Sequence, residues 1–203
     1  MAPRVRRSTL ALAVLSLLAE APMHPYRMQQ LIRERKKDSV VNVGQRASLY
    51  KAIDRLERAG LARVRETTRD RRWPERTVYE LTPAGREVLR EWLADALAAR
   101  QREFPEFPAA LSFLALLTPE EALVQLERRQ VAVKADLAAL EGSSRAAVAA
   151  SIPRLFLVED EYRAAVMRAE LRWLARVIGD LRAGRLTWSE EWARQYSSEA
   201  GPG

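Results

Sequence analysis

The chain has 203 residues, 48% hydrophobic and 30% charged, which is enough to bury a core in one large domain or two small ones. It contains no cysteine and one histidine, which excludes disulfides and zinc sites built from cysteine and histidine. No apolar run approaches the roughly 20 residues that a membrane-spanning helix needs. The formal net charge of +7 favours a polyanionic partner.

The excess of positive over negative charge lies entirely in the first half of the chain. Residues 1–100 contain 21 Lys and Arg against 12 Asp and Glu, whereas residues 101–203 contain 13 against 15. We therefore expect a basic binding domain over residues 1–102 and a neutral-to-acidic domain over residues 103–203.

The N-terminus allows two interpretations. Arg4, Arg6 and Arg7 precede an apolar stretch over residues 10–19, which is the outline of a secretory signal peptide and would make this an exported basic protein. The stretch is short, however, and its leucines keep the spacing of a core-facing helix. We favour that helix, preceded by arginines that form either a DNA-binding arm or a plain disordered terminus.

The first half predicts three helices, a β-hairpin and a fourth helix. Ser8 or Thr9 caps the first helix, Gly60 ends the third in the left-handed conformation, and Thr82 caps the fourth. The helices are expected over residues 9–20, 25–37, 46–59 and 83–102, the hairpin strands over 61–67 and 76–81, and a short extended piece over 40–43. This order is that of a winged helix-turn-helix.

The second half predicts helices only. A proline-rich joint over residues 104–108 is followed by a short helix over 109–117. Thr118 and Glu121 form a capping box for a helix that we expect to end near Glu141, closed by residues 142–144. Further helices are expected over 153–182 and 187–192. The predicted fold class is mainly α with a small β-hairpin wing, a winged helix-turn-helix joined to a helical dimerisation domain.

The third helix has the two faces of a recognition helix. Its core side is formed by Leu49, Ala52, Ile53 and Leu56. The opposite face and its shoulders carry donors for phosphates and base edges. These residues are Arg46, Ser48, Tyr50, Lys51, Arg55 and Arg58, together with Ala47 and Asp54. We predict DNA contact here, the alternative being an ordinary solvated helix surface.

The expected hairpin tip is rich in arginine. Its arginines are Arg69, Arg71, Arg72 and Arg76. A β-ribbon with such a tip can enter a minor groove or bind phosphates in bidentate fashion. The alternative is a solubilising loop.

The long helix over residues 153–182 carries an apolar stripe. Its members are Leu155, Val158, Tyr162, Ala165, Val166, Ala169, Trp173, Val177 and Leu181, widened by Leu174 and Ile178. The rest of the second half offers little to cover the stripe, so we predict a homodimer interface. Dimerisation would set two recognition helices about 34 Å apart on a palindromic operator. Tryptophans 92, 173, 188 and 192 are expected in apolar cores rather than around a ligand.

An enzyme is not expected. There is no Gly-rich phosphate loop, no nucleophile elbow and no metalloprotease motif. His24 has no catalytic partner at a recognisable spacing and is expected to pack in the turn before the second helix. Nothing in the sequence requires a cofactor.

The chain resembles the PadR family of bacterial transcriptional regulators over nearly its whole length. The resemblance lies in residues 15–26, 47–61 and 78–85, and the second half resembles the family's helical virulence-activator-like domain over 107–129 and 169–174. It implies a cytoplasmic, homodimeric winged-helix protein, usually a repressor that releases DNA when a small effector binds. It also implies that Tyr26, Ser48, Tyr50 and Lys51 lie near DNA, with the wing arginines beside them.

Two positions depart from the family pattern. Pro25 stands where the family usually has glycine, and Lys51 where it commonly has proline. The predicted function is a sequence-specific, double-stranded-DNA-binding regulator, a dimeric repressor relieved by a small-molecule effector. The alternatives are a transcriptional activator and a winged-helix adaptor for an acidic protein partner.

Overall fold

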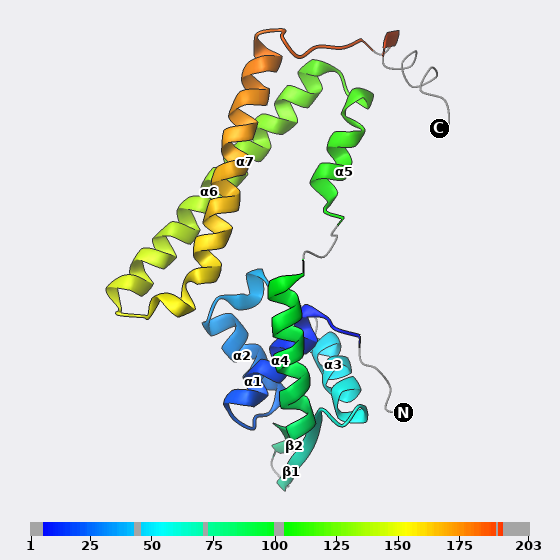
Figure 1. The fold of residues 1–203 in the computed structure, drawn as a ribbon, viewed down its shortest axis with the longest axis vertical. Helices are drawn as coiled ribbons and strands as arrows, with labels where there is room; N and C mark the ends of the chain where they lie inside the picture. Colours follow the sequence, from blue (N-terminus) through cyan, green and yellow to red (C-terminus); the bar gives the residue numbers. More distant parts are fainter. Residues whose placement is uncertain (1–5, 43–45, 71–72, 100–103, 190, 193–203) are drawn as a thin grey trace. The chain divides into compact units, whose positions relative to one another are not determined.

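Figure 1 shows the computed structural model, which describes residues 6–42, 46–70, 73–99, 104–189 and 191–192. The chain divides into two compact units, unit 1 (Met1–Arg102) and unit 2 (Glu103–Gly203). The described parts of unit 1 form four α-helices and a two-stranded antiparallel hairpin, and those of unit 2 are helical. The predicted fold class, mainly helical with a small hairpin, is confirmed. None of the described helices has the length and apolar character needed to cross a membrane.

Helices α1 (Thr9–Glu20) and α2 (Pro25–Glu34) begin where the sequence predicts. The Ser8 side chain accepts a hydrogen bond from the backbone N–H of Ala11 at 3.2 Å, as expected of an N-cap. Helix α2 ends earlier than predicted, because Lys36 takes a left-handed φ of 55° before the short 3₁₀-helix η1 (Lys37–Ser39). The extended piece expected over 40–43 is wrong for its described part, which is a turn and a bend over residues 40 and 41.

The wing consists of β1 (Ala62–Asp70) and β2 (Trp73–Leu81), which are longer than predicted. Ala62 pairs with Leu81, and Arg63 with Glu80; the register shifts once between Val64 and Glu66 and again nearer the tip. Bulges of this kind increase the local twist of a strand pair. The two register shifts are therefore expected to add to the twist of the wing.

The core of unit 1 joins α1, α2, the helix α3 (Arg46–Arg58) and the helix α4 (Pro83–Ala98). Leu15 of α1, Met28 of α2 and Ile53 of α3 are fully buried. Burying an apolar side chain of this size contributes roughly 1.5–3 kcal/mol. This shared core fixes α3 from behind and leaves its other side at the surface.

The first turn of α4 approaches the end of α3 very closely. The Thr82 hydroxyl donates to the carbonyl of Gly60 at 2.7 Å and accepts from the N–H of Gly85 at 3.0 Å. A side chain at Gly85 would clash with the carbonyl oxygen of Leu61. Gly60 itself has a φ of 72°, the left-handed stop that the sequence predicts. Helix α4 ends at Ala98 rather than near residue 102.

Unit 2 contains α5 (Glu106–Ser112), the short η2 (Leu114–Leu116), α6 (Pro119–Ala149), the short η3 (Arg154–Phe156) and α7 (Val158–Arg182). The capping box of Thr118 and Glu121 is present. The expected end of this helix near Glu141 is wrong, because α6 continues through residues 142–144. Only residues 191 and 192 of the helix expected over 187–192 are helical in the described part of the chain.

Helices α6 and α7 form an antiparallel pair in unit 2 (Figure 1). Leu126 of α6 packs with Leu174, Ile178 and Leu181 of α7, and α5 adds Phe107 to the edge of this cluster. The expectation that little in this half covers the stripe of α7 is therefore wrong for its C-terminal part. Leu181 is only 8% exposed, because it lies in the core of its own unit.

Candidate nucleic-acid interface

The predicted two-faced character of α3 is confirmed. Leu49, Ala52, Ile53 and Leu56 are at most 2% exposed and form its buried back. The exposed side carries Ala47, Lys51, Asp54, Arg55 and Arg58. A helix held in this way from behind presents a fixed row of polar groups to a partner.

The exposed side of α3 combines an aromatic ring with cations. Tyr50 is 43% exposed, and Ser48 is half-buried one turn before Lys51. The Nε of Arg55 donates to the carbonyl of Lys51 at 3.1 Å, which lays the guanidinium along the helix surface. The side chain of Arg46 is outside the part of the chain that the structure describes.

Tyr26 lies in the first turn of α2 with 59% of its surface exposed. The resemblance implies that Tyr26 lies near DNA, and its exposed ring leaves that role open as a prediction. The Nδ1 of His24 accepts a hydrogen bond from the N–H of Tyr26 at 3.0 Å. Sequence reasoning missed this cap, although a polar side chain directly before Pro25, the first helical residue, is a recognisable signal for it.

One backbone pair connects the turn before α2 to the wing. Met23 and Tyr79 exchange two hydrogen bonds, from Met23 N to Tyr79 O at 3.0 Å and from Tyr79 N to Met23 O at 3.1 Å. Burial raises the pKa of the Tyr79 hydroxyl, and the negative charges of Glu57 and Asp54 on α3 raise it further. The first turn of α2 is thus tied to β2, whose Tyr79 side chain lies against α3.

A side-chain ion pair joins the two strands at the base of the wing. Arg63 of β1 and Glu80 of β2 are cross-strand neighbours and form an ion pair at 2.7 Å. The predicted DNA contacts lie further out. Arg71 and Arg72 fall outside the described residues, and so do the side chains of Arg69 and Arg76, so their role stays a prediction.

Arg7, one of the three arginines expected in a basic arm, is bound to α4. The guanidinium of Arg7 donates to the carbonyl of Trp92 on α4 at 3.3 Å and lies 3.9 Å from the carboxylate of Asp95. Arg7 therefore belongs to the fold of unit 1 instead of an arm. Arg6 is exposed, whereas Arg4 precedes the first described residue.

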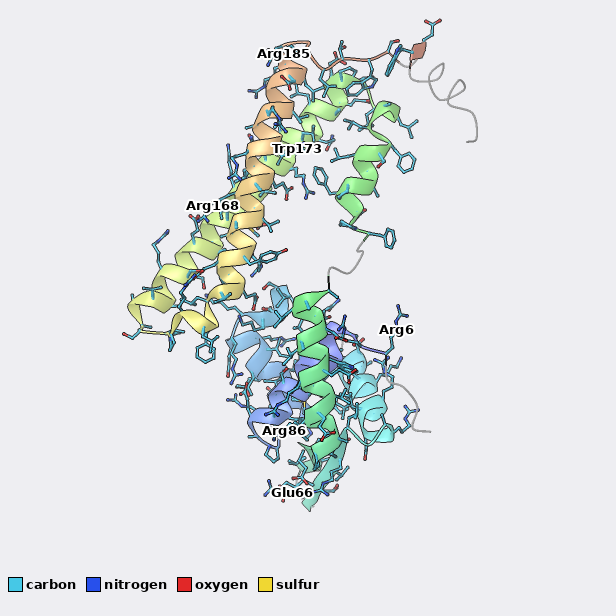
Figure 2. All side chains as sticks on the ribbon, viewed as in Figure 1. Arg6, Glu66, Arg86, Arg168, Trp173 and Arg185 are labelled. Carbon is cyan, nitrogen blue, oxygen red and sulfur yellow. The ribbon has the colours of Figure 1, made fainter. Side chains whose placement is uncertain are left out.

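The seven residues predicted for the dimer interface fall into two groups. Leu155, Val158, Tyr162 and Val166 are 78%, 50%, 71% and 48% exposed. Trp173 and Val177 are half-buried, and Leu181 is buried in unit 2. Trp173 (Figure 2) meets Phe107 of α5 edge-to-face, with ring centroids 5.9 Å apart. The first group forms an exposed apolar surface, and the second belongs to the core of unit 2.

The tryptophans and the acidic residues are the other candidate parts of a ligand pocket or a metal site. Trp92 packs on the core of unit 1, whereas Trp173 and Trp188 pack on that of unit 2. Trp192 is exposed. Among the described residues, no group of three or more His, Asp or Glu side chains is placed to hold a metal ion.

Comparisons with known proteins agree with this geometry. Residues 14–91 match the family model of the transcriptional regulator PadR-like family. Bacillus subtilis PadR, solved in complex with operator DNA, is 21% identical, with a TM-score of 0.66 over 86% of this chain and 99% of that chain. The same protein solved with p-coumaric acid is 20% identical, with the same TM-score and coverage.

A second protein shares the fold. The Vibrio cholerae virulence activator AphA is 21% identical, with a TM-score of 0.65 over 86% of this chain and 98% of that chain. No curated protein gives a significant sequence match. Residues 14–91 are thus similar to the transcriptional regulator PadR-like family, and the fold that this chain shares with PadR and AphA continues through its helical second unit.

Proposed function

We propose that this protein is a sequence-specific DNA-binding transcriptional regulator that acts in the cytoplasm as a homodimer. The observation that carries the proposal is α3, whose apolar back is buried while Tyr50, Lys51 and Arg55 stand exposed on its front. The PadR-like match over residues 14–91 supports it. So does the fold shared with a protein solved on operator DNA.

Binding would begin with neutralisation of phosphates, because the positive charge is concentrated in unit 1. The wing arginines, Arg69, Arg71, Arg72 and Arg76, would hold the backbone or an adjacent minor groove. Residues of α3 would then discriminate bases in the major groove, with Arg46 and Ser48 in its first turn and Tyr50, Lys51 and Arg55 beyond. Tyr26 would contact the backbone from α2.

The dimer would form through the exposed half of the α7 stripe. Leu155, Val158, Tyr162 and Val166 together are an apolar surface of a kind that isolated soluble proteins seldom leave in water. A two-fold pair of recognition helices would read a palindromic operator. Trp173, Val177 and Leu181 would support this surface from within unit 2.

We further propose a repressor that a small-molecule effector releases from DNA. The complex of Bacillus subtilis PadR with p-coumaric acid supports effector binding within this fold. An effector that binds the DNA-free state more tightly would shift the population away from the operator.

The test is fluorescence anisotropy of the purified protein on DNA from its own upstream region, with a scrambled duplex, at several salt concentrations. A preference of about 10³-fold for the native fragment is the expected result for a specific regulator. Equal affinities that collapse with salt, on this fragment and on a genome-derived fragment library, would contradict specific binding. They would favour the adaptor with an acidic protein partner.

A single substitution tests the assignment of α3. Lys51→Ala should weaken binding to the native fragment by about tenfold or more, and binding to the scramble much less, if Lys51 reads a base. Lys134→Ala, which removes the same charge from an exposed position on α6, is the matched control and should change neither. Equal losses on both duplexes after Lys51→Ala would reduce Lys51 to a phosphate contact.

A further inference from the structure

The first turn of α2 depends on one side chain for its cap. Pro25 is the first helical residue and has no N–H, so the first N–H that needs an acceptor belongs to Tyr26. The Nδ1 of His24 provides that acceptor at 3.0 Å. The carbonyl of His24 in turn accepts from the N–H of Arg27 at 2.9 Å and begins the helix.

The His24 cap lies between residues that are held by the core and the wing and a tyrosine ring that is exposed to solvent. On one side, Met23 is held by its two hydrogen bonds to Tyr79, and Pro25 is fully buried. On the other side, the Tyr26 ring stands in solvent. The hydrogen bond from Tyr26 to His24 therefore sets where the exposed ring stands relative to β2 and α3.

This hydrogen bond requires a neutral imidazole with its proton on Nε2. An imidazolium carries hydrogens on both nitrogens, so its Nδ1–H would face the N–H of Tyr26, donor against donor. It would also bring a positive charge to the positive end of the α2 dipole. Protonation is thus incompatible with the cap as it stands.

We propose that His24 is a positioning residue of the DNA interface, which makes discrimination between DNA sequences depend on a neutral imidazole. The proposal rests on the proposed function. His24 is the only histidine in the chain, so it is the one side chain whose ordinary pKa, about 6.5, lies between pH 5.5 and 8.

The elements that flank the cap carry other ionisable groups. Glu20 at the end of α1 is paired with Arg35, whose hydrogen bond lowers the pKa of that carboxyl. Arg27 is paired with Glu34 on α2. From β2 and α3 come Tyr79, whose pKa is raised, and its neighbours, Tyr50, Asp54 and Glu57. In general, carboxyl, phenol and guanidinium groups change charge outside the range from pH 5.5 to 8.

The experiment compares the full-length wild type with His24→Asn and His24→Ala by anisotropy on native and scrambled duplexes between pH 8 and 5.5. Asparagine is a strong N-cap that does not titrate, and alanine has no acceptor. We expect the wild-type preference for the native fragment to fall about fivefold on acidification. His24→Asn should hold its preference across the range, and His24→Ala should show the reduced preference at every pH.

Superimposable pH profiles for the wild type and His24→Asn would overturn the proposal. So would equal losses on both duplexes in His24→Ala. If His24→Ala fails to fold, the comparison with His24→Asn still decides.

Nitrogen NMR of the single imidazole gives a test that is independent of DNA. It should report the Nε2–H tautomer at pH 8, and an Nδ1–H tautomer would refute the cap. Absence of any DNA preference at pH 8 together with the Nε2–H tautomer would count against the proposed function while leaving the cap intact. The DNA role of His24 would fall with that function.

Discussion

At Gly85 the backbone of α4 passes so close to Leu61, the residue before β1, that no side chain fits. The ideal position of a Cβ there clashes with the carbonyl oxygen of Leu61 and lies 2.8 Å from a side-chain methyl of Leu81. The Thr82 hydroxyl closes the same junction by bonding to Gly60 and Gly85. One residue thus decides whether α4 can seat against the start of the wing.

Gly85→Ala should therefore destabilise the protein by about 3 kcal/mol, the upper part of the range for overpacking, because the obstacle is backbone. Gly142→Ala is the matched control. Gly142 lies within α6, and an added methyl would meet only the end of Arg145 at 3.9 Å. This change should stabilise by roughly 0.5–1 kcal/mol, since alanine favours helix. Urea unfolding of both variants measures the difference, and a neutral Gly85→Ala would disprove the close contact.

At the scale of elements, the sequence predicts the end of one helix, α3, but not the end of another, α6. Helix α3 ends at Gly60, as predicted, because glycine accepts the left-handed conformation without a steric cost. Helix α6 passes Gly142 and Ser144, and the Ser144 hydroxyl bonds back to the carbonyl of Leu140 at 3.0 Å. It ends instead at Ala149, and Ser151 just beyond it is a non-glycine residue with a φ of 57°. Local composition alone does not indicate that α7 supports the continued helix.

Ser151→Gly should stabilise unit 2 by roughly 0.5–1 kcal/mol, because glycine takes this conformation without the strain that serine bears. The N–H of Ile152 closes the end of α6 on the carbonyl of Ala147 at 3.0 Å, and this bond survives the change. Ser144→Gly, inside the helix, should destabilise by about 0.5 kcal/mol, the difference in helix propensity between the two residues. Thermal unfolding monitored by circular dichroism would show the opposite shifts, and a destabilised Ser151→Gly would contradict this account.

In the candidate interface, too, some features could be predicted from the sequence and others could not. The buried and exposed faces of α3 could be predicted, because they follow from a helical period within 13 residues. The burial of Leu181 could not, since it depends on α6, whose Leu126 lies more than fifty positions away in sequence. The joining of Met23 to Tyr79 is equally long-range. Periodicity assigns a residue to a face, but not the partner that covers it.

At the scale of the whole molecule, the proposed dimer depends on the exposed half of α7. Tyr162→Glu should convert dimer to monomer at micromolar concentration, because it buries an unpaired charge in the interface while leaving the core of unit 2 untouched. Loss of the second half-site should weaken operator binding by about a hundredfold. Sedimentation velocity measures the first effect and anisotropy the second.

Val131→Glu places the same charge on another exposed apolar position of unit 2 and is the control. A dimer that survives Tyr162→Glu would move the interface away from this stripe. Trp173→Ala is a poor probe, since Trp173 packs on Phe107 and its loss would weaken unit 2 itself.

The α6–α7 pair is held in register by ion pairs at separate levels. Glu127 bonds Arg182 and Glu141 bonds Arg168, both at 2.6 Å, about four helical turns apart along each helix. Arg129 and Glu170 form a third pair. Sliding α7 by one turn, about 5.4 Å, would break all three at once and unseat Leu174. We therefore expect α6 and α7 to move as one rigid body. A displacement at one end of the pair would tilt both helices together and would not slide one helix along the other.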